Sequence, residues 1–381
     1  MNILFVSNYL NHHQKELCEE IIRNVDQFHF VETDENHQQG FQTRIEEEAY
    51  VLRYCGNEKA VEELLLNADV VIFGACPNHL IDMRMRENKL SFLYSERFFK
   101  KGLWRRFIPQ TRKKISRRVV QYKNQNFYVL CASAYLPYEL SLLGFPVEKC
   151  FKWGYFPEIK YYQIAELCAG KNKRKILWVG RFLKLKHPDD VLMMAKRLKD
   201  AGYEFQLGMV GAGILEEKLK GVVDSMGLSD CVTFHGSVSS SQVRVFMEEA
   251  GIYLFTSDRR EGWGAVMNES MNSSCAVVAS HIVGSVPYLI KHKDNGLVYH
   301  SGDVDSLYEN VKYLLDNPRE QERLGYAAYE TITGLWNAEV AAQRLVTLSE
   351  HLLAGEKYPD LFQTGPCSSA KVIKDDWFYE E

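Results

Sequence analysis

Short apolar runs alternate with longer amphipathic stretches along most of this chain, and this alternation restricts the fold more than any other feature. The runs are rich in β-branched and aromatic residues and end in polar loops, as buried strands of a parallel sheet do. Alternation of such strands with helices predicts a doubly wound sheet. In the first part of the chain the predicted strands are residues 3–7, 69–74, 90–94 and 128–132, and a helix is predicted over residues 14–23.

A second series of strands and helices follows the basic run at residues 171–175, which has the composition of a linker. Two series predict an α/β fold with two Rossmann-like domains in tandem. We place these domains at residues 1–165 and 166–335, followed by a C-terminal segment, 336–381, with a helix over 338–353. The predicted strands of the second series are 176–179, 204–210, 232–235, 252–256 and 276–279, and its predicted helices are 189–201, 215–226 and 241–249.

The composition is that of a globular protein large enough for two cores, with 381 residues, 46% hydrophobic and 25% charged. Nine cysteines, an odd number without a C-x-x-C pair, predict reduced, buried thiols in a cytosolic protein. The N-terminus lacks the pattern of a signal peptide, and no apolar run reaches the roughly 18 residues of a membrane span. We therefore expect a cytoplasmic location.

Two carboxylates eight positions apart, Glu261 and Glu269, follow the predicted strand 252–256. A helix that begins near Gly264 directs its free N–H groups and the positive end of its dipole at the carboxyl edge of the sheet. A diphosphate suits that position, and Glu269, more than one turn inside the helix, is placed to reach hydroxyl groups. The same spacing is common on ordinary helices, so it acquires meaning only from its neighbours.

Fixed cations follow the predicted strand 176–179. Arg181 and Lys186 lie in a loop before a predicted helix, where together they could stabilise a diphosphate without a metal ion. Lys184, in the same loop, is expected to be a bystander. A basic loop is more often simply solvated, so this pair is a hypothesis that needs the other loops.

Two further loops end in glycines. Residues 208–213 form a strand followed by Gly211 and Gly213, but the dinucleotide pattern G-x-G-x-x-G needs a glycine where Glu216 stands. We interpret this loop as a tight turn, near a donor or purely structural. After the predicted strand 232–235, the backbone beyond His235 and Gly236 could hydrogen-bond a nucleobase edge.

In their order and spacing these loops resemble the retaining GT-B glycosyltransferases of family 4, the glycosyl transferases group 1. The resemblance is carried by residues 180–186, 210–213, 234–236 and 261–280, and it continues at residues 295–298. It implies two Rossmann-like domains facing an interdomain cleft, with the acceptor on the first and the nucleotide-sugar on the second. It also implies a C-terminal helix that crosses back to the N-terminal domain.

The resemblance further implies roles for single residues. Arg181 and Lys186 hold the donor phosphates, with backbone amides around Gly264, Ala265 and Val266 completing the phosphate site. Glu269 binds the ribose hydroxyls, Glu261 faces the transferred sugar, and Gly211, His235 and Gly236 line the nucleotide. The resemblance also implies that the anomeric configuration is retained and that no metal ion or other cofactor is needed.

The N-terminal half departs from the family. Many members place a histidine after an N-terminal strand, where it contacts the donor sugar. This chain continues Ser95-Glu96-Arg97 there, and Glu96 is the candidate for that catalytic position. The first loop holds His12 and His13, which we interpret as loop residues rather than catalysts. Tyr288 stands where many members have an acidic residue.

Residues 97–118 contain ten lysines and arginines and no acidic residue, with aromatic and aliphatic side chains between them. Phe99, Leu103 and Phe107 are spaced to share one helical face, and Pro109 divides the stretch into two short helices. This pattern indicates either a helix at an anionic membrane surface or a solvated helix packed on the core. No nucleic-acid-binding module accompanies it, so we expect no nucleic-acid partner.

The function that we predict is transfer of a sugar from a nucleotide-diphosphate-sugar, UDP- rather than GDP-linked, to a sugar acceptor in surface polysaccharide biosynthesis. The acceptor could be lipid-linked, with the enzyme peripheral on the inner face of the cell membrane. Two alternatives stay open: a non-catalytic protein that binds sugar nucleotides, and a sugar phosphorylase on the same fold. An epimerase is disfavoured because the dinucleotide pattern is absent.

Overall fold

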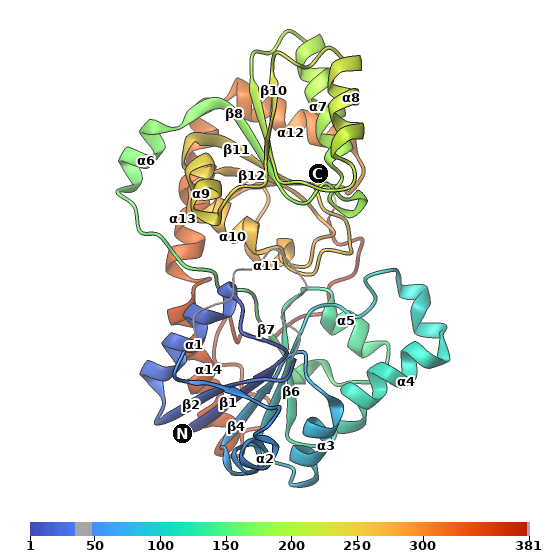
Figure 1. Ribbon diagram of the computed structural model, residues 1–381, viewed down its shortest axis with the longest axis vertical. Coiled ribbons are helices and arrows are strands. Elements are labelled where there is room, and N and C mark those ends of the chain that lie inside the picture. Colours follow the sequence, from blue (N-terminus) through green and yellow to red (C-terminus); the bar gives the residue numbers. More distant parts are fainter. Residues whose placement is uncertain (35–47, 379–381) are drawn as a thin grey trace. The chain divides into compact units, whose positions relative to one another are not determined.

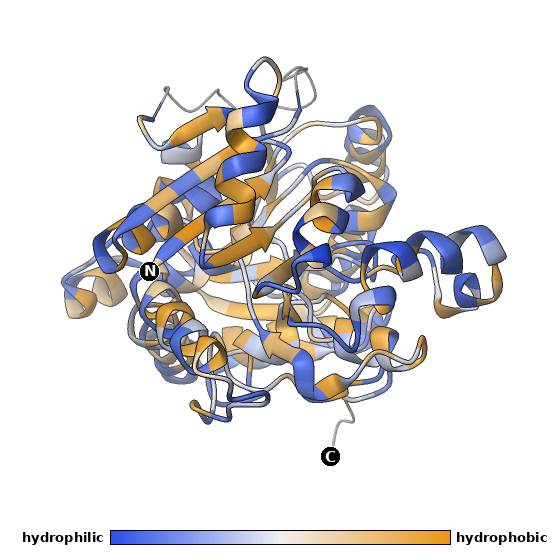
Figure 2. Cartoon of the chain, turned by 90° about the horizontal axis from the view of Figure 1, so that it is seen from below, coloured by the Kyte–Doolittle hydropathy of each residue, from blue (hydrophilic) through white to orange (hydrophobic). Residues whose placement is uncertain are grey.

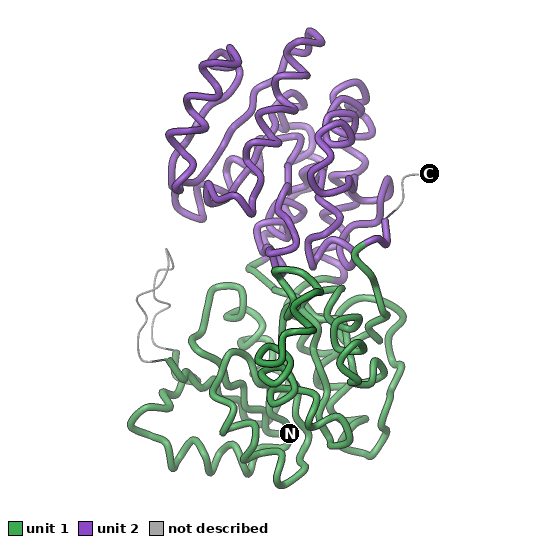
Figure 3. Tube along the Cα trace, turned by 90° about the vertical axis from the view of Figure 1, so that its right-hand side faces the viewer, with its two compact units in different colours: residues 1–158, 336–375 green, residues 159–335, 376–381 purple. Residues whose placement is uncertain are grey.

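The computed structural model describes residues 1–34 and 48–378, and the chain divides into two compact units (Figures 1 and 3). Each unit contains one parallel sheet whose strands alternate with helices, so the predicted α/β, doubly wound architecture is confirmed. Residues 379–381 of the predicted C-terminal segment lie outside the described part. Unit 1 comprises residues 1–158 and 336–375, and unit 2 comprises residues 159–335 and the chain end from residue 376.

Unit 1 has a seven-stranded sheet in the order β3-β2-β1-β4-β5-β6-β7. This is the Rossmann order, in which the direction of connection reverses between β1 and β4. The four predicted strands are present. The pattern missed β2, β3 and β7, because β2 is interrupted by polar residues and the other two have only three residues each. The strands are β1 Asn2–Ser7, β2 Gln27–Glu32, β3 Val51–Arg53, β4 Val70–Phe73, β5 Ser91–Ser95, β6 Phe127–Cys131 and β7 Cys150–Lys152.

The C-terminal helix α14 packs against α1 within unit 1, and the two lie side by side in Figure 1. The predicted return of this helix to the N-terminal domain is therefore confirmed. Helix α1 begins at His12, so His12 and His13 belong to its first turn and the loop interpretation is wrong. The α-helices of unit 1 are α1 His12–Asn24, α2 Glu58–Asn67, α3 Asn78–Arg86, α4 Pro109–Arg118, α5 Leu136–Ser141 and α14 Ala338–Leu353.

The basic stretch forms two short helices around Pro109, as predicted, but its apolar face differs. Residues Leu103–Phe107 form the 3-10 helix η1, and Phe99 precedes it and is buried, whereas Phe107 is 72% exposed. Phe99 and Phe107 therefore do not share a face. With three residues per turn, η1 instead aligns Trp104 with Phe107. Figure 2 shows this segment and α4 as a largely hydrophilic lobe that projects from the rest of unit 1.

Unit 2 has a six-stranded sheet in the order β10-β9-β8-β11-β12-β13, again the Rossmann order, with the reversal between β8 and β11. Its core includes Trp178, Phe182 and Leu254. The strands are β8 Asn172–Val179, β9 Gln206–Val210, β10 Val232–Gly236, β11 Ala250–Phe255, β12 Ala276–Ser280 and β13 Leu297–Tyr299. The helices are α6 Ile164–Gly170, α7 Pro188–Asp200, α8 Glu216–Ser225, α9 Ser240–Glu249, α10 Ala265–Asn272, α11 Val286–Leu289, α12 Val304–Asp316 and α13 Pro318–Gly334.

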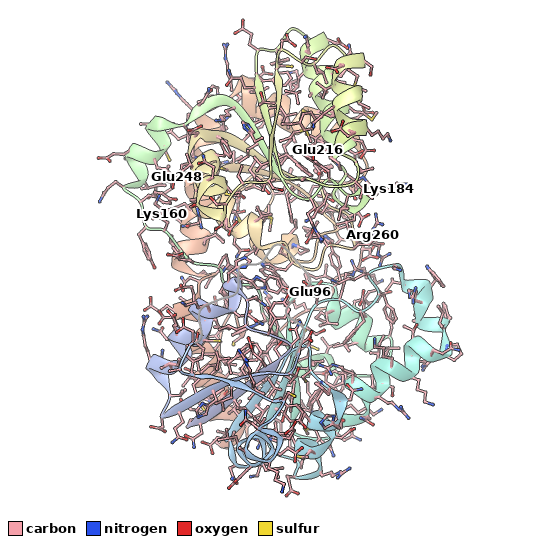
Figure 4. The ribbon with its side chains drawn as sticks, in the orientation of Figure 1. Glu96, Lys160, Lys184, Glu216, Glu248 and Arg260 are labelled. Atoms are coloured by element: carbon pink, nitrogen blue, oxygen red, sulfur yellow. The ribbon has the colours of Figure 1, made fainter. Side chains whose placement is uncertain are left out.

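Unit 2 begins at Ile159, earlier than the sequence boundary at 165/166, because the incoming chain is tied to unit 2 at once. The backbone N–H of Lys160 donates to Asn272 Oδ1 at 2.9 Å, and Asn272 Nδ2 donates to the Lys160 carbonyl at 3.0 Å. Lys160 Nζ also pairs with Glu248 Oε1 at 2.5 Å, a contact that can be followed in Figure 4.

The sequence predicted a linker at the basic run 171–175, and this prediction is wrong. The run leads directly into β8, which begins at Asn172. Lys171 is buried, and its ammonium donates to the carbonyls of Met247 and Ala250, both at 2.8 Å. These carbonyls stand at the end of α9, where a cation is favoured by the helix dipole. Lys171 is thus part of the interior, although it lies in a run that has the composition of a solvated linker.

The cysteines agree with the sequence prediction: all nine are free thiols, and six of them are buried. Across the described residues, no helix has both the length and the apolar character needed to cross a lipid bilayer.

Candidate donor-binding site

The candidate site lies in unit 2 at the carboxyl ends of β8 and β11, where the strand order reverses. These two strands are neighbours in the sheet, so the loops that follow them begin side by side. In open α/β sheets this is where ligands bind. One loop, residues 180–187, carries Arg181 and Lys186, and the other, residues 256–264, carries Glu261.

Hydrogen bonds join the two loops. Thr256 Oγ1 donates to the carbonyl of Lys186 at 2.6 Å and accepts from Trp178 Nε1 at 3.0 Å. The backbone N–H of Asp258 donates to the carbonyl of Leu185 at 2.8 Å. Figure 4 labels Lys184 of the first loop and Arg260 of the second. Segments about 70 residues apart in sequence are thereby held in one arrangement.

Lys186 and Glu261 form an ion pair across these loops. Their side chains are 14% and 17% exposed, and Ser257 Oγ donates to Glu261 Oε2 at 3.1 Å. The sequence predicted both residues as ligand contacts in separate roles, and the structure brings them together. Arg181 is exposed at the start of the same loop. A phosphate that approaches Lys186 competes directly with the Glu261 carboxylate.

Gly264 shapes the start of α10. Its φ of +83° is left-handed, and a Cβ there would lie 2.3 Å from Cζ of Phe255. Only glycine fits this position without a shift of the phenyl ring. Ala265 and Val266 then open the helix and are partly exposed. Their backbone N–H groups are among those that an α-helix leaves unpaired in its first turn.

Glu269 lies on α10 and is half-buried. Burial raises the pKa of its carboxyl, and the charge of Arg244 opposes that rise. Arg244, from α9, donates to the Glu269 carbonyl at 3.0 Å and to Asn272 Oδ1 at 2.9 Å. Arg244 was missed by the sequence reasoning, since a single arginine on an amphipathic helix carries no motif.

The glycines after β9 serve close packing against the loop that carries Arg181. A Cβ on Gly211 would lie 2.0 Å from the Gly180 carbonyl oxygen, and one on Gly213 would lie 2.6 Å from that of Phe182. The N–H of Phe182 donates to the Ala212 carbonyl at 2.9 Å. This contact supplies a structural reason for the two glycines.

His235 is on β10, and the centroid of its ring is 4.5 Å from that of Phe246. The ring also lies against Gly208, where an added Cβ would be 3.1 Å from His235 Nε2. Burial and the nearby Lys175 charge lower the pKa of the imidazole. Gly236 has a left-handed φ of +67°, and its carbonyl accepts from the Gly211 N–H at 2.8 Å. The predicted nucleotide residues Gly211 and Gly236 are therefore in direct contact.

Glu96 belongs to unit 1 and lies at the carboxyl end of β5. Its carboxylate accepts a hydrogen bond from Tyr155 Oη at 2.5 Å and forms an ion pair with Lys100. The Tyr155 ring stacks on His13 at a centroid distance of 4.1 Å. These loops meet at the carboxyl edge of the unit 1 sheet. The predicted role of Glu96 stays a prediction.

One group of side chains in the described part of the chain has the spacing of a metal site. Ligand atoms of His187, Asp189 and Asp190 lie within 4.8 Å of one another. Nδ1 of His187 is already 3.2 Å from Asp190 Oδ2 in an ion pair, and Asp189 is exposed. The expectation of a metal-independent reaction stays a prediction.

The fold and the loops together define a class of protein. Residues 163–331, which cover nearly all of unit 2 up to the end of α13, match the family model of glycosyl transferases group 1. Over these residues the chain is similar to the glycosyl transferases of this group, as the sequence resemblance predicted, and its two Rossmann-like units are those of the GT-B fold.

Particular relatives come from polysaccharide and glycolipid biosynthesis. The chain is 26% identical to the amylovoran biosynthesis glycosyltransferase AmsK of Erwinia amylovora, over 73% of this chain and 68% of AmsK. It is 28% identical to a GDP-mannose-dependent phosphatidylinositol monomannoside mannosyltransferase of Mycobacterium tuberculosis, over 36% of this chain and 37% of that protein. The match to the mycobacterial protein, like that to an uncharacterised glycosyltransferase of Haemophilus influenzae, spans less than half of the relative's length.

Among solved structures, the complex of Anabaena Alr3699/HepE with UDP superposes with a TM-score of 0.68 at 14% identity, covering 92% of this chain and all of that one. The lipopolysaccharide outer core galactosyltransferase WaaB superposes with a TM-score of 0.62 at 16% identity, covering 88% of this chain and 99% of WaaB. At these identities the likeness establishes the fold alone.

Proposed function

We propose that this glycosyltransferase transfers a sugar from a UDP-sugar to a sugar acceptor in surface polysaccharide biosynthesis, with retention of the anomeric configuration. The observation that carries the proposal is the Lys186–Glu261 ion pair at the switch point of the unit 2 sheet. Glu261 of this pair stands four residues before Ala265, where α10 begins. A diphosphate and a sugar need the two kinds of group in this pair, a cation and a carboxylate.

Each residue has a role in this proposal. Lys186 leaves Glu261 and binds the donor phosphates together with Arg181, while the N-terminus of α10 adds backbone N–H groups. Glu261, released from Lys186, accepts hydrogen bonds from hydroxyls of the transferred sugar. Glu269, more than one turn inside α10, binds the ribose hydroxyls. Two cations fixed in one loop stabilise the charge that develops on the leaving phosphate.

Retention follows if the leaving phosphate accepts the proton of the acceptor on the face that the sugar leaves. The protein then positions the substrates and stabilises charge, without a carboxylate as general base. No metal ion is part of the proposed reaction.

The choice of UDP is tested by ligand binding. The Anabaena Alr3699/HepE structure is a complex with UDP, whereas the mycobacterial relative is named as GDP-mannose-dependent. Thermal unfolding with UDP, GDP and ADP sugars separates these donors. A ligand at 100 times its dissociation constant stabilises the protein by about 2.7 kcal/mol. UDP-sugars are expected to raise Tm, and a rise with GDP-sugars alone would refute the choice of nucleotide.

Variants of the loop then test the site. Lys186→Ala and Arg181→Ala are each expected to reduce the Tm rise, because each removes a cation from the phosphates. Lys184→Ala is the matched control, since Lys184 is exposed in the same loop. An equal rise in all three variants would contradict the phosphate assignment. Sugar phosphate formed from donor and inorganic phosphate, in place of transfer, would identify a phosphorylase instead.

We further propose that the acceptor is lipid-linked and that the η1–α4 lobe holds unit 1 at the inner face of an anionic membrane. Trp104 and Phe107 share one face of η1 and are 59% and 72% exposed. Exposed aromatic side chains of this kind favour the interfacial region of a bilayer. Five cations of the same stretch are exposed: Lys101, Arg112, Lys113, Lys114 and Arg117.

Not every cation of the stretch contributes to this surface. Arg97 is buried, and Arg118 donates to the carbonyl of Cys76 at 2.6 Å and to Asn78 Oδ1 at 2.8 Å. The exposed cations nevertheless attract anionic lipid by about 1 kcal/mol each near the surface. On a chain with a net charge of −4, this is a local concentration of positive charge.

Tryptophan fluorescence offers a direct test, because Trp104 is the most exposed tryptophan in the described part of the chain. Vesicles containing phosphatidylglycerol are expected to shift the emission to shorter wavelength, whereas pure phosphatidylcholine is not. Trp104→Phe should abolish the shift and keep co-sedimentation, and Lys113→Glu with Lys114→Glu should abolish both. Absence of salt-dependent co-sedimentation of the wild-type chain would contradict the membrane proposal.

A further inference from the structure

His187 has an unusual backbone at a central place in the candidate site. It follows Lys186 directly and precedes α7, with φ 49° and ψ 50°. This left-handed conformation is uncommon for residues other than glycine, although asparagine, aspartate and histidine adopt it more often than the others do. A side chain kept in such a conformation is expected to make contacts that outweigh the strain.

The imidazole ring of His187 lies between two carboxylates from different elements. Nδ1 is 3.2 Å from Asp190 Oδ2 on α7, and Nε2 is 3.4 Å from Asp258 Oδ2 in the loop after β11. The three side chains are 28%, 13% and 17% exposed. Two ring nitrogens that both face carboxylate oxygens indicate an imidazolium, since a neutral ring has one nitrogen without a proton.

The surrounding charges favour this protonated form. The carboxylates of Asp190 and Asp258 face the ring. Two cations are also near: Arg260 Nε is 3.0 Å from Asp258 Oδ1, and Lys186 is the residue before His187. The contacts with the Asp190 and Asp258 carboxylates raise the pKa of His187 to about 10, against the effect of burial. The pKa of the Asp258 carboxyl falls well below its ordinary value, since the contacts with His187 and Arg260 outweigh its burial.

We propose that His187 is a positioning residue whose imidazolium joins the loop that carries Lys186 to the loop that carries Glu261. In the proposed function Lys186 leaves Glu261 when it binds phosphate, so that ion pair opens. The His187–Asp258 contact uses neither residue and stays closed. It keeps the phosphate-binding and sugar-binding side chains at one spacing while the ligands exchange.

The protonation state of the ring is tested without any donor. In NMR titrations, the His187 C2 proton, assigned by its loss in His187→Gly, is expected to keep the shift of an imidazolium from pH 6 to pH 8.5. In Asp258→Asn the same resonance is expected to titrate at lower pH. A midpoint near 6.5 in the wild-type chain would overturn the proposal. So would broadening of this resonance by micromolar Mn²⁺, which would make His187 a metal ligand.

The positioning role, which rests on the proposed donor site, is tested by UDP binding. His187→Gly relieves the left-handed strain and removes the imidazolium, so the backbone is not a source of misfolding. We expect a rise of about tenfold in the UDP dissociation constant in His187→Gly, and a similar rise in Asp258→Asn. The double variant is expected to show about tenfold rather than a hundredfold, because both changes remove one contact.

Lys293→Gly is the matched control, because Lys293 is another left-handed residue of unit 2, with φ 65°. It is expected to bind UDP as the wild type does. Unchanged UDP affinity in His187→Gly, or additive effects in the double variant, would overturn the positioning role. If the wild-type chain fails to bind UDP, the proposed donor is wrong, while the NMR titration still decides whether the bridge exists.

Discussion

The two units share one strand order, but the carboxyl edges of their sheets are built differently. In unit 2 the loops after β8 and β11 are joined by charged side chains, the Lys186–Glu261 pair and the His187–Asp258 pair. In unit 1 the loops after β5 and β7 and the start of α1 meet through aromatic rings. Tyr155 stacks on His13 there, and its hydroxyl binds Glu96.

This difference shows that the strand order provides the edge and the loops provide its chemistry. Charged pairs within reach of solvent can exchange partners with an anionic ligand, as the proposed donor site in unit 2 requires. Aromatic faces and a held carboxylate suit uncharged hydroxyl groups, which an acceptor sugar offers. The same fold can therefore present a phosphate site in one unit and a hydroxyl site in the other.

The largest expected effect concerns a buried ion pair that supports the unit 1 edge. Arg97 Nε is 3.0 Å from Glu139 Oε1, and both side chains are fully buried. Arg97→Met leaves Glu139 without its cation and should destabilise unit 1 by about 3–5 kcal/mol in urea unfolding. Lys113→Met, on the exposed part of the same basic stretch, should stay within about 0.5 kcal/mol. Equal losses would mean that the Arg97 pair does not anchor this edge.

The second prediction compares kcat/KM in two lysine variants, one at the carboxyl edge of each sheet. Lys186→Ala is expected to lower kcat/KM about 10²–10³-fold, because it removes a cation from the leaving phosphate. Lys100→Ala removes the cation that pairs with Glu96 in unit 1 and should lower kcat/KM less than about tenfold, as expected for an exposed pair. Initial rates at saturating and limiting donor give kcat/KM for each variant. Equal losses of kcat/KM in Lys186→Ala and Lys100→Ala would contradict the distinction between the two edges.

Gly264 tests whether the unit 2 edge tolerates a change of backbone. Gly264→Ala places a Cβ 2.3 Å from Phe255 at a φ of +83° and should destabilise the protein by about 2–4 kcal/mol. Gly221 on α8 has open space around its Cβ position, so Gly221→Ala should stabilise by about 0.5–1 kcal/mol. Calorimetric unfolding measures both changes, and opposite signs are required.

The sequence predicted more of unit 2 than of unit 1, for physical reasons. Long buried strands and the loops after them carry strong local patterns, so β8 to β12 were predicted correctly. The same loops led us to single out Lys186 and Glu261. The three-residue strands β3, β7 and β13 bury too few side chains to show periodicity. Pairing is also invisible along the chain, so the contact between Lys186 and Glu261 could not be anticipated.

Buried charge misled the sequence reasoning twice. Lys171 and Arg97 lie in basic runs that have the composition of surface segments, yet both are buried against acceptors distant in sequence. His187 was passed over because a histidine beside a lysine carries no motif, although His187-Pro188-Asp189-Asp190 is a helix start with carboxylates in its first turn. Tertiary partners, which sequence patterns do not reveal, determine the roles of these residues.

The smallest effect is expected from the unit 1 carboxylate. Glu96→Gln keeps the hydrogen-bond acceptor for Tyr155 but removes the charge, so the loop should persist. If Glu96 binds acceptor hydroxyls, KM for the acceptor should rise about tenfold while the dissociation constant for UDP stays unchanged. Tyr155→Phe leaves the carboxylate charged but less restrained and should raise the acceptor KM by a smaller factor. A change in UDP affinity in either variant would assign Glu96 to the donor and remove the distinction between the two edges.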